Sequence, residues 1–153
     1  MSLKERLIED LKRAIKEGNE RRKSTLRLVR AAIVNAEIER YRQELDDEGV
    51  LAIIANEAKK RRESIAEFAK GGRQDLVDQE EAELQILLEY LPKQMTREEI
   101  VAMAQGVIEE AGATGPAQMG EVMRRLMPQL KGRADGRLVN QIVTRLLAEQ
   151  QKR

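Results

Sequence analysis

The chain has 153 residues, of which 36% are charged and 41% hydrophobic, and it contains neither cysteine nor histidine. These absences exclude disulfides, thiolate or imidazole metal sites, and any serine or cysteine nucleophile activated by histidine. Good helix formers dominate and only three residues are aromatic, so we predict an all-α protein. We expect neither a bound metal nor a cofactor. We recognise no signal peptide and no apolar run long enough to span a membrane. From this we expect a cytoplasmic protein that does not bind membranes.

The charges are segregated along the chain although the net charge is only +1. Residues 1–73 carry a net charge of +4, residues 74–115 of −8, and residues 116–153 of +5. Such an imbalance favours an anionic partner for the basic segments. Alternatively, the acidic segment folds back on the basic ones and neutralises part of their charge.

Four helices are expected in the N-terminal part of the chain. Apolar residues at helical spacing and their flanking caps and glycines predict the following helices: one from the Ser2–Glu5 capping box to Gly18, one from about Glu20 to Glu44, one from Asp46-Asp47 to Gly71-Gly72, and one from about Asp75 to Leu91. Pro92 ends the last of these helices, and the pattern restarts after it. We therefore predict an N-terminal helical domain over residues 1–93.

Three shorter helices are expected in a compact C-terminal domain over residues 94–153. The first begins at a Thr96–Glu99 capping box and ends at Gly112. The second follows Gly115-Pro116 and is expected to stop at Pro128. Asp135 is expected to cap the third helix after a turn at Gly132.

The connection between the last two predicted helices is the strongest candidate for a binding site. It is rich in cations, and one more follows on the outer face of the last helix: Arg124, Arg125, Lys131, Arg133, Arg137 and Arg145. Arginine binds phosphate well because its planar guanidinium donates two parallel hydrogen bonds. We interpret this segment as a nucleic-acid contact, and the alternative is an ordinary solvated helix face.

A second basic stripe is predicted on the second helix, where Lys23, Arg27 and Arg30 recur at helical spacing. An ordinary surface is the preferred interpretation of this stripe. The scarcity of aromatic residues bears on the kind of nucleic acid, because single-strand binders stack bases on aromatic rings. None follows Tyr90, so a bound RNA would be recognised by its shape and phosphates.

No residue is assigned to catalysis. The acidic residues at the start of the fourth helix suit the helix dipole, and Glu80 and Glu83 are expected to reach arginines of the third helix. The serines lie in no phosphate-binding loop and in no nucleophile elbow.

Several stretches, in order along nearly the whole chain, resemble the GatB/YqeY family, in particular its free-standing YqeY-like proteins. The matching stretches are Thr25–Leu28 with Ala31–Ile33, Lys60–Ile65, Gly72–Leu76, Glu89–Pro92, Met119–Met123, and Lys131–Gly136 with Leu138-Val139. The resemblance implies four N-terminal helices and a three-helix tail.

The resemblance also implies kinship with the C-terminal part of GatB, a subunit of the glutamine-dependent amidotransferase that corrects mischarged tRNA. In that complex the helical tail helps to hold tRNA, and its basic turn falls on Lys131–Gly136 here. The large domain in which GatB performs the transfer has no counterpart in this chain. We therefore expect a non-catalytic module that binds tRNA or assists the amidotransferase. The alternatives are a protein–protein adaptor without RNA and an inherited carbon–nitrogen ligase activity with glutamine as amide donor.

Overall fold

The computed structural model describes residues 1–153 and contains helices alone, which confirms the predicted all-α class. The helices are α1 (Leu3–Glu17), α2 (Glu20–Glu39), α3 (Asp47–Lys70), α4 (Gln74–Leu88), α5 (Arg97–Ala111), the 3₁₀ helix η1 (Pro116–Gln118), α6 (Met119–Leu130) and α7 (Gly136–Gln151). The chain divides into two compact units, Met1–Leu91 and Pro92–Arg153. No helix is long and apolar enough to cross a membrane.

Local capping chemistry sets most helix ends. Ser2 accepts a hydrogen bond from the Glu5 amide at 3.1 Å, and Thr96 accepts one from the Glu99 amide at 3.2 Å, so both predicted capping boxes are confirmed. α1 ends at Gly18, whose φ of +69° lies in the left-handed region that glycine adopts without steric cost.

Three predicted helix ends are wrong, and the first is that α4 ends at Leu88, before the predicted Leu91. α2 ends at Glu39 and not near Glu44, because Glu37 turns the chain by accepting a 2.9 Å hydrogen bond from the amide of buried Leu45. α6 continues through Pro128 to Leu130. A proline so near the end of a helix removes only one intrahelical bond, and burial of Leu130 in the core offsets that loss.

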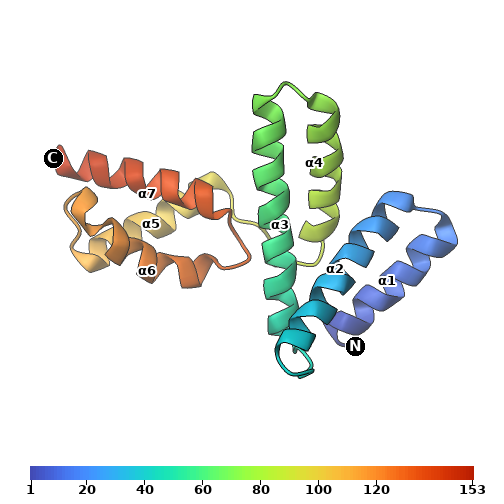
Figure 1. Ribbon diagram of the computed structural model, residues 1–153. Helices are drawn as coiled ribbons and strands as arrows, with labels where there is room; N and C mark the ends of the chain where they lie inside the picture. Colours follow the sequence, from blue (N-terminus) through green and yellow to red (C-terminus); the bar gives the residue numbers. More distant parts are fainter. The chain divides into compact units, whose positions relative to one another are not determined.

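The first unit consists of two antiparallel helix hairpins, α1–α2 and α3–α4 (Figure 1). Their apolar faces share one core, in which the largest fully buried side chains are Leu7, Leu26, Val29, Val50, Ile54 and Leu87. The helices are therefore held by packing, since the removal of apolar surface from water is the main favourable term in folding.

Ion pairs between helices reinforce this core. Arg61 of α3 lies 3.4 Å from a carboxylate oxygen of Glu80 and 3.1 Å from one of Glu83, both on α4. Arg22 of α2 pairs with Glu89 at 2.8 Å. The prediction that Glu80 and Glu83 reach an arginine of the third helix is confirmed, and part of the acidic segment does fold back on the basic one.

Tyr90 joins the end of α4 to α1. Its hydroxyl donates a 2.5 Å hydrogen bond to Asp10, and the guanidinium of Arg6 lies 4.6 Å from the centre of its ring. Burial, reinforced by the Asp10 carboxylate, raises the pKa of Tyr90 well above its ordinary value. The Tyr90 hydroxyl is therefore a neutral donor that connects the two hairpins.

The second unit packs α5, α6 and α7 around a separate core (Figure 1). Its largest fully buried side chains are Ile100, Val122, Leu126, Leu130, Ile142 and Leu147. The buried residues of α6 and α7 fix these two helices against each other. The turn between them, residues 131–135, is thereby held at the surface of this unit.

Candidate nucleic-acid interface

Backbone geometry and capping build the turn between α6 and α7. Gly132 adopts a φ of +76°, and the Arg133 amide donates to the Leu130 carbonyl at 2.8 Å. Asp135 then caps α7 by accepting a 3.1 Å hydrogen bond from the Arg137 amide. Gly132 and Asp135 thus determine the conformation of the turn. The side chains of its basic residues are then free to bind a ligand.

Three of the predicted cations at this turn form no ion pair. Lys131 and Arg137 are exposed, and Arg133 is half-buried. Since no carboxylate of the protein neutralises them, they can offer their full charge to an anion. Arg137 lies in the first turn of α7, where the backbone dipole also favours negative charge.

The other three predicted cations are paired with glutamates on their own helices. Arg124 and Arg125 both bond to Glu121, Arg125 at 2.8 Å, and Arg145 lies 3.4 Å from Glu149. The pKa of Glu121 lies below its ordinary value, chiefly because Arg125 hydrogen-bonds to it and also because Arg124 is near. The candidate interface therefore includes fewer of the predicted cations, because these three are already paired.

Sequence reasoning missed two cations in the segment that joins the units' helices α4 and α5. The Met95 amide donates to the Arg133 carbonyl at 2.8 Å, and Gln94 donates to the Gly132 carbonyl at 2.8 Å. These bonds tie the segment holding Lys93 and Arg97 to the turn. Both side chains are exposed and form no ion pair. We define the turn cluster as these five cations: Lys93, Arg97, Lys131, Arg133 and Arg137.

The second predicted stripe is not a continuous cationic track. Lys23 pairs with Glu20 at 2.8 Å, whereas Arg27 and Arg30 are exposed and form no ion pair. Exposed Leu28 and Val34 alternate with these arginines along α2. A phosphate backbone gains little from such apolar neighbours, so this stripe suits a nucleic acid less well than the turn cluster does.

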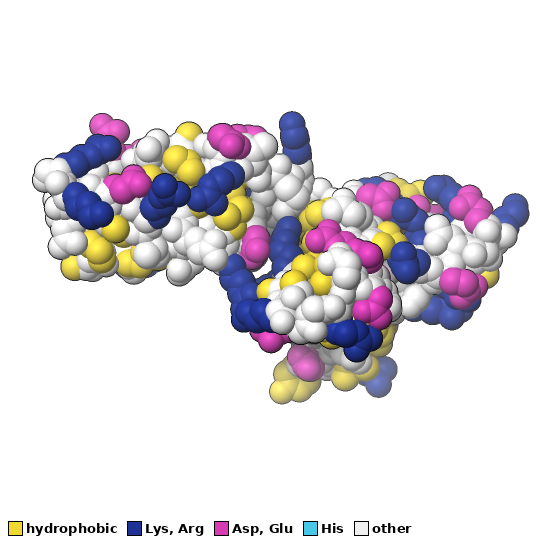
Figure 2. Space-filling view, turned by 90° about the horizontal axis from the view of Figure 1, so that it is seen from above, with side chains coloured by type: hydrophobic (Ala, Val, Ile, Leu, Met, Phe, Trp, Pro, Cys, Tyr) yellow, Lys and Arg dark blue, Asp and Glu magenta, His cyan; other side chains and the backbone are white.

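The surface shows the same mixture of charges. In Figure 2, basic side chains are interspersed with acidic and apolar ones over the visible face of each unit. A site for phosphate therefore depends on which cations lack a neighbouring carboxylate, and the number of basic residues alone does not define it.

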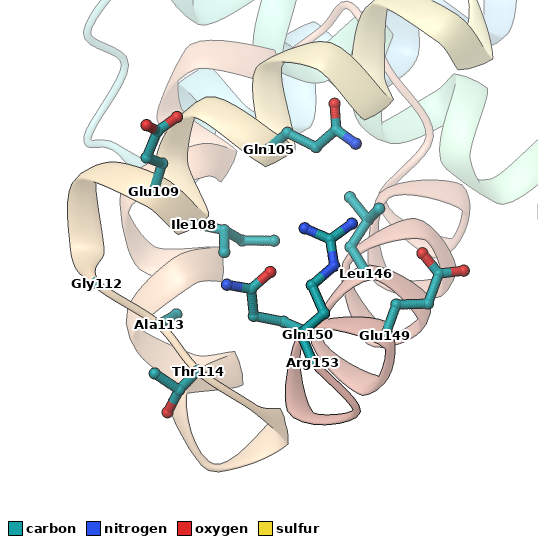
Figure 3. A pocket seen from close by; sticks show the side chains of 10 residues that line it. All are labelled: Gln105, Ile108, Glu109, Gly112, Ala113, Thr114, Leu146, Glu149, Gln150 and Arg153. Atoms are coloured by element: carbon teal, nitrogen blue, oxygen red, sulfur yellow. The ribbon is translucent and has the colours of Figure 1, made fainter.

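A hollow of about 620 Å³ lies between the C-terminal ends of α5 and α7. Figure 3 shows its apolar floor, which includes Ile108 and Leu146, and the side chain of Arg153 extending into it. Glu109 and Glu149 stand on its rim. None of the predicted cations lines this hollow, and no group of three or more carboxylates is placed to hold a metal ion.

Fold and site together define an all-helical protein whose second unit presents a cationic turn between its last two helices. The chain matches the family model described as Yqey-like protein over residues 4–147, and it belongs to that family. The predicted family is therefore confirmed.

Three curated relatives share 34% identity with this chain, and each is named "Altered inheritance of mitochondria protein 41, mitochondrial". They come from Pyrenophora tritici-repentis, Kluyveromyces lactis and Eremothecium gossypii, and the matches cover 84%, 78% and 71% of this chain. The same matches span 71%, 66% and 60% of the relatives' own lengths.

These names contradict the expected cytoplasmic location, because the relatives are mitochondrial proteins. The expectation was derived from the lack of a recognisable signal peptide and of a membrane-spanning run. Neither feature distinguishes the cytoplasm from the interior of an organelle, so the argument could not support the conclusion drawn from it.

Proposed function

We propose that the protein binds a folded RNA, tRNA in particular, through the turn cluster, and that it does so as a non-catalytic module. The observation that carries the proposal is that Lys131, Arg133 and Arg137 surround one turn without an ion pair. Cations that are already neutralised within the protein gain less from a phosphate than free ones do.

The physical basis is the release of counterions from the RNA backbone when lysine and arginine side chains replace them. Arginine adds geometric fit, because its planar guanidinium matches phosphate oxygens with two parallel hydrogen bonds. Arg97, Arg133 and Arg137 supply this geometry, and Lys93 and Lys131 supply point charges.

The absence of aromatic residues from the second unit favours a folded RNA over a single strand. Tyr41, Phe68 and Tyr90 all lie in the first unit. Without rings on which to stack bases, the unit would recognise phosphates and the shape of the minor groove.

The preference for tRNA rests on the family resemblance. The turn Lys131–Gly136 matches the basic turn of the GatB tail, which helps to hold tRNA in its own complex. Assistance to a tRNA-dependent amidotransferase would follow from this binding, with the partner enzyme supplying the chemistry.

The test is a titration with unmodified tRNA at several salt concentrations, comparing the protein with its Arg133→Glu/Arg137→Glu variant. Each lost phosphate contact reduces the steepness of the plot of log affinity against log salt by about 1. We therefore expect the variant to show a shallower plot and an affinity at low salt that is lower by a factor of about ten or more. A binding constant indifferent to salt and to the substitutions would refute the proposal.

Arg21→Glu/Lys59→Glu is the matched control, since it changes the net charge equally at exposed, unpaired cations of the first unit. It should retain most of the affinity. Equal losses in the two variants would show that overall charge, and not the turn cluster, attracts the RNA.

A further inference from the structure

The outer side of α2 carries apolar residues that the rest of the first unit leaves about half exposed. Leu28 is 50% exposed, Val34 49% and Ile38 57%. With Ala31 they recur three, three and four residues apart, so the four side chains share one broad helical face about 15 Å long. We call these four residues the α2 face.

This face is additional to the one that α2 uses for folding. Leu26, Val29 and Ile33 lie buried in the core on the inner side of the helix. A single exposed leucine needs no explanation, but a row of large apolar residues on a surface helix is typical of an interaction site.

A groove between α1 and α2 borders the α2 face. It has a volume of about 180 Å³, with Leu7, Ile8 and Ile33 as its apolar lining and Val34 shared with the face. A groove beside a raised apolar row suits a partner helix, because side chains of that helix can enter the groove while its backbone lies along α2. A flat lipid surface would leave the groove unfilled.

The free charges beside the groove are cationic. Arg30 lines the groove, Arg27 precedes it by one turn, and neither forms an ion pair. The one carboxylate lining the groove, Glu37, accepts hydrogen bonds from Lys4 at 2.7 Å and from the Leu45 amide. These bonds lower the pKa of Glu37, and the bond from Lys4 contributes most. The charge of Glu37 is therefore already matched within the protein.

We propose that the α2 face docks an acidic amphipathic helix of a partner protein. Apolar residues at i, i+3 and i+7 of that helix would pack on Val34, Ile38 and the groove, and carboxylates on its flank would pair with Arg27 and Arg30. The site is separate from the turn cluster and does not depend on RNA binding.

The test uses the full chain and a synthetic, fluorescein-labelled amphipathic helix with leucines at i, i+3 and i+7 and flanking glutamates. A second peptide carries lysine in place of each glutamate. We expect fluorescence polarisation to detect the acidic peptide only. Val34→Asp and Arg27→Glu/Arg30→Glu should each weaken its binding about tenfold or more, the size that loss of a central contact brings.

The control Arg21→Glu/Lys59→Glu should bind the acidic peptide normally, because neither residue lines the groove. Circular dichroism should show unchanged helicity in every variant, and Val34→Ser provides a milder substitution if Val34→Asp loses helicity. Binding of tRNA should survive Val34→Asp, which separates this site from the proposed RNA contact.

Four results would overturn the proposal. Equal affinity for the two peptides would remove the electrostatic argument, and binding indifferent to Val34→Asp would place the contact elsewhere. A concentration-dependent dimer abolished by Val34→Asp would make a second copy of the chain the occupant. Sedimentation with anionic phospholipid vesicles, abolished by the same substitution, would assign the face to a lipid surface.

Discussion

In the first unit, the ion pairs of Arg61 with Glu80 and Glu83 and of Arg22 with Glu89 join different helices, whereas every ion pair of the second unit lies within one helix. The first unit thus uses part of its charge to position helices. The second unit is held by its apolar core, which leaves the turn cluster free for an anion.

The difference shows why the number of basic residues is a poor guide to binding. Residues 1–73 hold more cations than residues 116–153, but several of them are neutralised by α4 or by α1 and α2. A charge paired between helices contributes to folding, and its removal should affect stability. Removal of a free charge should affect only binding.

The largest effect should come from Arg61→Ala. Only 14% of the Arg61 side chain is exposed, and its loss leaves Glu80 and Glu83 facing each other without a cation. We expect the free energy of unfolding of the first unit to fall by about 3 kcal/mol, as for other buried ion pairs that lose one partner. Urea unfolding followed by circular dichroism measures this. Arg137→Ala should change stability by less than about 0.5 kcal/mol. Equal effects of the two substitutions would contradict the distinction between charges paired across helices and free charges.

Tyr90→Phe should come next. It removes the hydroxyl that donates to Asp10 and should lower the free energy of unfolding by about 2 kcal/mol, the range for hydrogen bonds to charged groups. Because the pKa of Tyr90 is raised in the folded state, its contribution is complete below about pH 10 and is lost as the pH rises through the folded value. Alkaline unfolding curves should show this loss in the parent and not in the variant. A parallel decline in both would exclude Tyr90 as its cause.

Asp135→Ala should have a smaller effect, confined to the second unit. Loss of the α7 cap should lower its free energy of unfolding by about 1 kcal/mol. Affinity for tRNA should stay equal or increase, because the substitution removes the negative charge of Asp135 from the same turn. Hydrogen exchange of α7 and the tRNA titration measure the two effects. Weaker tRNA binding by a folded variant would show that the cap positions the cations, and the division between folding and binding residues would then fail.

The parts of this structure that the sequence predicted well depend on neighbouring residues. The capping boxes at Ser2 and Thr96 and the cap at Asp135 are local, because each side chain bonds an amide two or three residues away. The pairing of Arg124 and Arg125 with Glu121 could also have been predicted, since residues three and four apart on a helix meet.

The parts that escaped prediction depend on distant residues. Lys93 and Arg97 join the turn only through hydrogen bonds from the Gln94 side chain and the Met95 amide to carbonyls almost forty positions later. The end of α2 is likewise set by Glu37 reaching Leu45 outside the helix. No periodicity in the sequence encodes contacts of this kind, so the outline of the candidate site needed the folded chain.

Glu80→Gln should have the smallest effect on stability. The direction of that effect tests the difference between the two units. Burial raises the pKa of Glu80 despite the opposing charge of Arg61, so its ionisation destabilises the first unit as the pH rises through the folded value. The pKa of Glu121 is lowered by Arg125, so its contribution to the second unit is present above its ordinary pKa and is lost as the pH falls. Glu80 should therefore change stability above the ordinary glutamate pKa of about 4.3 and Glu121 below it, with slopes of opposite sign. Glu80→Gln should leave stability at neutral pH unchanged or slightly higher, with exposed Glu81→Gln as its control. A loss as large as that of Arg61→Ala would mean that Arg61 requires the Glu80 charge, and that Glu83 alone does not satisfy it.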